Sequence, residues 1–145
     1  MRLALATVLA LAATTVTAEP RDVPRGDPLR RALLDTVRPT AEWAIGGRIE
    51  FVVSQLREDA GWAFLAGDMQ RPRGVAIACE ETRMAADCGF MDGMSVFALL
   101  RDEGRRWRLV DMHVAPTDVS FSAWPERYGV PCALILDGAF CEGQR

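Results

Sequence analysis

The feature of this sequence that most constrains its fold is the order of its hydrophobic patterns. One helical stretch comes first, and two strand-turn-strand stretches follow it. Leu29, Leu33, Val37, Ala41 and Ala44 recur at spacings of four, four, four and three, which places them on one face of a helix. The later stretches are rich in β-branched and aromatic residues and are divided by turns that contain glycine. A chain with this order buries the helix face against a sheet, which predicts an α+β fold.

The helix is expected to begin after Asp27, an N-cap residue, because Pro28 suits the first helical position. Gly46 and Gly47 are expected to end it. Pro39 lies within the stretch and has no N–H to donate, so we predict a kink there or a division into two helices.

The two hairpins predict four antiparallel strands. The first is expected to pair residues 49–56 with residues 61–66, and the second residues 94–101 with residues 106–114. Together they predict a curved four-stranded sheet packed over the N-terminal helix. The long loop that separates the hairpins, residues 68–93, exceeds an ordinary turn.

Residues 1–18 have the features of a secretory signal. Arg2 precedes an uninterrupted apolar run, and Val16-Thr17-Ala18 is a small-residue cleavage pattern. The run is too short to span a bilayer, so we expect no stable membrane anchor. Cleavage would leave a flexible lead-in at residues 19–26 and a single domain at residues 27–145, in the periplasm or secreted.

Four cysteines in an exported chain predict a disulfide framework. Three pairings are possible, and the two nine-residue spacings favour the local ones, Cys79 with Cys88 and Cys132 with Cys141. Each would stabilise the fold by roughly 2 to 3 kcal/mol. The first would staple the long loop and the second the C-terminal tail. A metal or thiol site is the weaker alternative, because no C-x-x-C spacing occurs.

The charge composition excludes several functions. All 17 basic residues are arginine, so chemistry that needs a lysine nucleophile is excluded. Without residues 1–18, the chain contains 16 basic and 20 acidic residues. This weakly acidic balance argues against a nucleic-acid partner, which needs a clustered basic surface. We also expect no cofactor.

Three segments carry a resemblance to known sequences. The runs LLDTVRP, IEFVVSQLREDAGWAFLAGDMQRP and RRWRLVDMHVAPTDVSFSAWPERYG resemble small, uncharacterised exported proteins of proteobacteria, over roughly residues 28–128. The resemblance implies a cystatin-like or nuclear-transport-factor-like α+β architecture, in which a curved antiparallel sheet grips a helix. It implies no catalytic residues, and a fold of this kind does not define a function.

His113 is the only histidine, so any chemistry that needs an imidazole must use it. In a regular strand, Trp107, Leu109, Asp111 and His113 share one face. Asp111 and His113 are therefore candidate catalytic residues for acid-base chemistry at the mouth of a cone-shaped pocket. A Ser-His-Asp hydrolase has less support, because no G-x-S-x-G elbow is present.

A soft-metal carrier is a further alternative, because thioethers are ligands for copper. The candidates, which also suit a role as core residues, are Met69, Met84, Met91, Met94 and Met112. We assign no metal site from this pattern.

The tryptophans separate the core from a candidate contact surface. Trp43, Trp62 and Trp107 are expected in the core. Trp124 lies in an irregular segment with Arg127 and Tyr128, which either packs over the open end of the sheet or contacts a partner. The preferred function is a monomeric or weakly dimeric binding module for another periplasmic or secreted protein. The alternatives are the small enzyme and the copper carrier.

Overall fold

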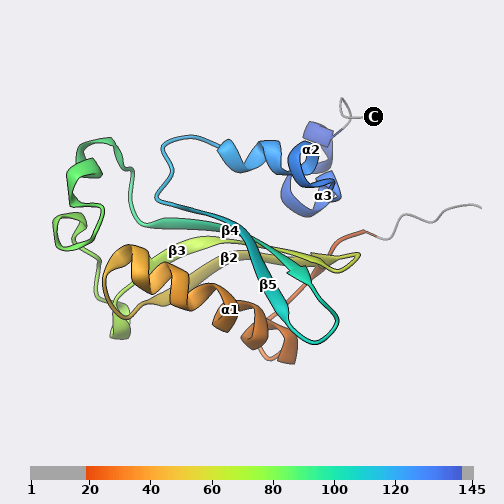
Figure 1. Ribbon diagram of the computed structural model, residues 1–145, viewed down its shortest axis with the longest axis horizontal. Helices are drawn as coiled ribbons and strands as arrows, with labels where there is room; N and C mark the ends of the chain where they lie inside the picture. Colours follow the sequence, from red (N-terminus) through yellow and green to blue (C-terminus); the bar gives the residue numbers. More distant parts are fainter. Residues whose placement is uncertain (1–18, 142–145) are drawn as a thin grey trace, which may run out of the picture.

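A five-stranded antiparallel sheet separates one long helix from a group of short C-terminal helices (Figure 1). The computed structural model describes residues 19–141, and the predicted signal peptide lies outside them. The elements in chain order are β1 (Arg21–Asp22), α1 (Pro28–Ile45), β2 (Glu50–Asp59), β3 (Trp62–Gln70), β4 (Ser95–Asp102), β5 (Trp107–Val114), α2 (Trp124–Tyr128), α3 (Cys132–Ile135) and α4 (Gly138–Cys141). The α+β class is confirmed.

The sheet has the order β1-β2-β3-β4-β5, so the prediction of four strands was short by one. The extra strand, β1, comes from the segment that was predicted as a flexible lead-in. Arg21 pairs with Glu58 and Asp22 with Arg57, and the neighbouring Val23 is buried. A two-residue strand has too little periodicity to be recognised in a sequence, and its pairing depends on a partner far along the chain.

Helix α1 begins and ends where the sequence indicates. The Asp27 carboxylate accepts a hydrogen bond of 2.8 Å from the Leu29 N–H, and Gly46 ends the helix in the left-handed conformation. The helix continues through Pro39 as one element, so the predicted division into two helices does not occur. Pro39 lies on the exposed face, where water can satisfy the carbonyl group that its ring leaves without a donor.

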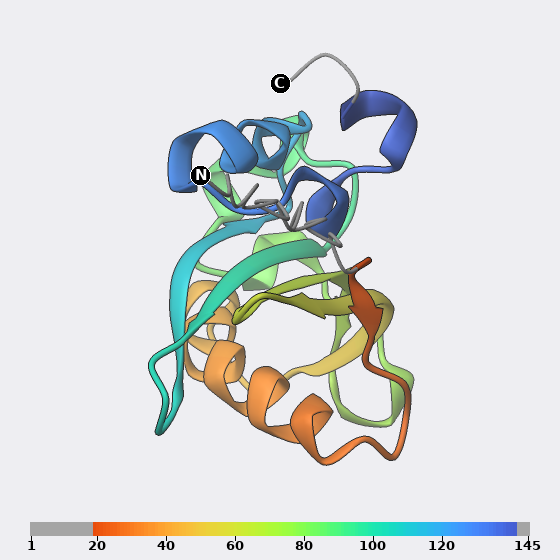
Figure 2. The ribbon, with the colours of Figure 1, turned by 90° about the vertical axis from the view of Figure 1, so that its right-hand side faces the viewer.

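Both faces of the sheet are covered by hydrophobic clusters. Leu33 and Val37 of α1 pack on one face against side chains such as Leu65. In Figure 2 the sheet wraps over α1, with β4 and β5 on one side of the helix and β1 on the other. On the opposite face, Trp124 and Leu134 from the C-terminal segment form the second cluster with strand side chains.

Two β-bulges bend the sheet. In β2, Ser54 is the extra residue between the Val53–Gly67 and Gln55–Ala66 pairs. In β5, Val110 is extra, because Leu99 pairs with Asp111 while the next residue of β4 pairs with Leu109. A bulge increases the local twist and leaves two successive side chains on one face. The curvature over α1 therefore has an identifiable local cause in both strands.

The two disulfides are the predicted local pairs, Cys79–Cys88 in the long loop and Cys132–Cys141 in the tail. They indicate an oxidising, non-cytoplasmic environment. Within residues 19–141, no helix combines the length and apolarity needed to cross a membrane.

The stapled loop packs beside the C-terminal end of α1, as Figure 1 shows. The Arg83 guanidinium lies over the Trp43 ring, 5.3 Å from its centroid. Trp43 is nevertheless 68% exposed, so its prediction as a core residue was wrong. Trp62 and Trp107 are partly buried, each at the border of a cluster.

Candidate functional site: a polar cluster and an open sheet edge

Asp111 and His113 lie together on β5, but on a different face from the one predicted. Their side chains approach to 3.8 Å between His113 Nε2 and Asp111 Oδ1. Trp107 and Leu109 pack on the α1 side, whereas His113 contacts Trp124 on the C-terminal side. The bulge at Val110 explains the difference, because one extra residue reverses the faces of all residues after it.

The C-terminal segment completes this polar cluster, which consists of Asp111, His113, Ser120 and Tyr128. Ser120 Oγ and His113 Nδ1 share a hydrogen bond of 2.8 Å. The Tyr128 hydroxyl donates a hydrogen bond of 2.6 Å to Asp111 Oδ2. Sequence analysis could pair Asp111 with His113 from strand alternation, but not with Tyr128, which reaches them only after the chain has folded back.

The polar cluster tethers the C-terminal segment to β5. Its two hydrogen bonds between side chains each join the strand to a residue after it, and the His113 ring stands edge-on to Trp124 at 5.0 Å between centroids. The face of Trp107 and Leu109, which was predicted to carry Asp111 and His113 at the mouth of a pocket, is filled by Leu33 and Val37 of α1. The location predicted for that pocket was therefore wrong, since Asp111 and His113 project from the other face.

The hydrogen bond to Asp111 raises the pKa of the Tyr128 hydroxyl above its usual value near 10. A carboxylate that accepts a hydrogen bond from the phenol hydroxyl stabilises the neutral form, and the nearby negative charge disfavours the phenolate. Because the pKa is raised in the folded state, this contribution to stability is complete below pH 10. It is lost as the pH rises through the folded-state pKa.

We predict that Asp111→Asn moves the Tyr128 pKa back toward 10. Tyr128 is the only tyrosine in the chain, so absorbance at 295 nm during an alkaline titration reports its ionisation alone. Asp118→Asn is the matched control, because the Asp118 carboxylate accepts from the Ser120 N–H and has no bond to Tyr128. Equal titration curves for the wild type and Asp111→Asn would contradict the tether.

Trp124 does not form a partner-binding surface. It is 1% exposed and packs edge-on against Phe64 at 6.2 Å between ring centroids. Its candidacy as a contact residue was therefore wrong, and the alternative that the segment packs over the sheet is correct. Of its two neighbours, Arg127 is exposed, while Tyr128 is partly buried and held by Asp111.

Three of the five candidate methionines belong to the hydrophobic core. Met69, Met94 and Met112 belong to the cluster around Ile45, beside the C-terminal half of α1. Met112 and His113 are consecutive in a strand, so their side chains point to opposite faces. Among residues 19–141, no group of three or more His, Cys, Asp and Glu side chains is placed to hold a metal ion.

The outer edge of β2 is covered over only part of its length. β1 pairs with Arg57 and Glu58, and the Val23 N–H donates a further bond of 2.8 Å to Leu56 O. Pro24 has no N–H and cannot continue this ladder. The chain then leaves the sheet toward α1, so within the described residues no strand borders residues 50–53 of β2.

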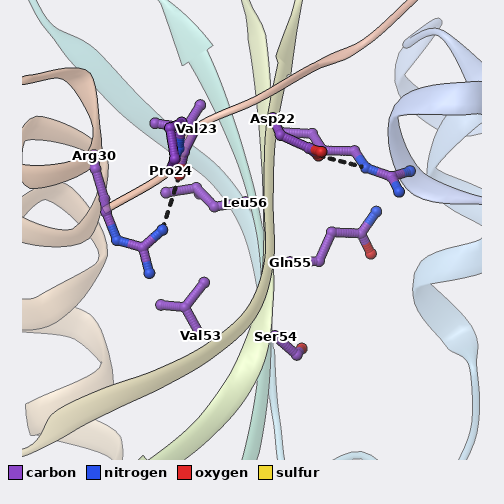
Figure 3. A pocket seen from close by; sticks show the side chains of 9 residues that line it. Asp22, Val23, Pro24, Arg30, Val53, Ser54, Gln55 and Leu56 are labelled. Atoms are coloured by element: carbon purple, nitrogen blue, oxygen red, sulfur yellow. Dashed lines mark hydrogen bonds and ion pairs between the residues drawn. The ribbon is translucent and has the colours of Figure 1, made fainter. Parts of the chain in front are cut away.

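A hollow of about 370 Å³ lies where β1 leaves β2 (Figure 3). Val53 and Leu56 point to the α1 side of the strand, whereas Ser54 and Gln55 point to the other side. Arg30 extends from α1 into the hollow and donates a hydrogen bond of 2.8 Å to Val23 O. Sequence analysis missed this site, although a proline after a short polar segment and an uncharged Phe51–Ser54 run were available signals.

Comparison of the chain with models of known protein families, with curated proteins and with solved structures found no match in any of the three.

Proposed function

We propose that this protein is an exported binding module that holds an extended segment of another periplasmic or secreted protein as an added strand beside β2. The observation that carries this proposal is the uncovered edge of β2 next to the end of β1. Such an edge presents backbone N–H and C=O groups that an incoming strand can pair with. The main chain then supplies affinity, and side-chain pockets such as the hollow at Arg30 supply selectivity.

The contrast between the two edges of the sheet supports the choice of β2. The β5 edge carries the bulge at Val110 together with the charged Arg108 and Asp111, which are devices that discourage strand pairing. The open part of β2 begins with the exposed Glu50 and continues through the uncharged Phe51–Val53, of which Val52 is 48% exposed. An exposed, uncharged stretch on an edge strand is a preferred place for another chain to pair.

The remaining features of the molecule agree with a binding role in an oxidising compartment. The two disulfides hold the long loop and the C-terminal tail in place. The positions of these two segments therefore do not depend on a large hydrophobic core. The polar cluster is accounted for by its tether between β5 and the C-terminal segment. The proposal therefore depends on the sheet edge and not on Asp111 or His113.

We predict that Val52→Lys weakens partner binding by about tenfold, equivalent to about 1.4 kcal/mol, because a charged side chain on the edge opposes strand addition. Val75→Lys is the matched control: Val75 is 55% exposed, lies in the long loop and forms a bridge with Arg71 rather than with β2. The measurement is capture of periplasmic proteins by a photo-crosslinker at position 50, followed by mapping of the crosslinked peptides.

The proposal is supported if one partner protein is crosslinked through a defined segment. This crosslink should be lost in Val52→Lys and kept in Val75→Lys. Equal capture by both variants would contradict the proposal. A crosslink only to a second copy of this chain would also contradict it, because the edge would then be a self-association surface.

A further inference from the structure

We infer that Arg30 selects an aspartate or glutamate side chain in the strand that β2 receives. This inference rests on the proposed function, because it concerns a side chain of the incoming strand. It adds the chemical class of one partner residue and names the residue of this chain that recognises it.

The position of the hollow determines which partner side chain enters it. Val53 and Leu56 border the hollow on the α1 side of β2 (Figure 3). In antiparallel pairing, residues opposite each other point to the same face of the sheet. A partner residue beside Val53 therefore directs its side chain toward α1 and into the hollow, where Arg30 lies.

Arg30 differs from three other arginines near this edge, each of which has a carboxylate partner. Arg21 pairs with Asp27 at 2.6 Å, Arg57 with Asp22 at 3.2 Å, and Arg38 with Asp35 at 3.7 Å. Among the described residues, no carboxylate oxygen lies within 4.0 Å, the limit for an ion pair, of a guanidinium nitrogen of Arg30. Asp22 also borders the hollow, but its carboxylate pairs with Arg57, and its side chain lies on the opposite side of β2 from Arg30 (Figure 3).

The hydrogen bond to Val23 O orients the Arg30 guanidinium without neutralising it. The Val23 carbonyl oxygen accepts a hydrogen bond from one of the five N–H groups of Arg30, so the remaining N–H groups can still bind a carboxylate. Arginine and carboxylate form charge-assisted, often bidentate hydrogen bonds, which are stronger than bonds between neutral groups. A partner glutamate in this hollow should therefore bind more tightly than a glutamine of the same shape.

The test uses two capped seven-residue peptides, TVTETVT and TVTQTVT, with ¹⁵N-labelled protein. In a strand, the central Glu or Gln and the two valines lie on one face. We expect both peptides to shift the amide resonances of Phe51–Gln55, and the Kd of the glutamate peptide to be about tenfold lower. Arg30→Gln should remove this ratio. Arg31→Gln is the matched control and should keep it, because the Arg31 side chain is 90% exposed and does not line the hollow.

The outcomes separate the inference from the function on which it rests. If neither peptide shifts the edge amides, strand addition at β2 is wrong and the inference is overturned with it. If both peptides bind there with equal Kd, the edge functions as proposed and the role of Arg30 is wrong. A glutamate preference that survives in Arg30→Gln also overturns the inference. The amide spectrum of each variant shows directly whether it is folded.

Discussion

Replacement of Trp124 by alanine is expected to lower the free energy of unfolding by about 4 kcal/mol. The indole is 1% exposed and belongs to the cluster that attaches the C-terminal segment to the sheet, with Phe64 and Leu134. Its removal leaves a cavity that the neighbouring aromatic rings cannot fill without losing their own contacts. The tether through His113 is weakened at the same time, because the imidazole ring packs edge-on against the indole.

Trp43→Ala is the matched control for this prediction. Trp43 is 68% exposed and the Arg83 guanidinium lies over its ring, so its removal should cost about 0.5 kcal/mol. Urea unfolding followed by circular dichroism measures both variants. A stable Trp124→Ala protein, with a loss below that of Trp43→Ala, would contradict the core role assigned to Trp124.

Gly67→Ala is expected to destabilise the protein by about 3 kcal/mol, although alanine adds only one methyl group. A Cβ atom at this position would overlap Val52 O and lie 3.0 Å from Val53 Cα. Both contacts are with backbone, which cannot rotate away as a flexible side chain can. β2 would have to move away from β3 beside the bulge at Ser54, where the open edge begins.

Gly89→Ala is the control, because a Cβ atom at Gly89 meets no other atom within 4 Å. We expect it to change stability by less than about 1 kcal/mol, in the stabilising direction, since alanine restricts the unfolded chain. Thermal unfolding of both variants measures the difference, and about 3 kcal/mol corresponds to a melting temperature lower by roughly 10 °C. A Gly67→Ala protein as stable as Gly89→Ala would show that β2 and β3 are not this close.

Local patterns determined much of the fold. The spacing of apolar residues identified α1, and Asp27 and Gly46 marked its ends correctly. The two hairpins were correct in number and order, although β3 extends to Gln70, four residues beyond its predicted end. The short separation of the cysteines identified the disulfides. Each of these features depends on residues close together in the chain, so its cause is visible in a short stretch of sequence.

Contacts between distant segments decided the candidate sites. The face of Asp111 and His113 depended on the bulge at Val110, which exists only in the register between β4 and β5. Trp124 became buried because the C-terminal segment folds back over the sheet, while Trp43 stayed on the surface. The open edge of β2 exists because the pairing of β1 with residues more than 30 positions away does not continue past Pro24. The sequence by itself determined the elements and disulfides, whereas tertiary pairing alone decided which side chains share a face and which backbone edge stays free.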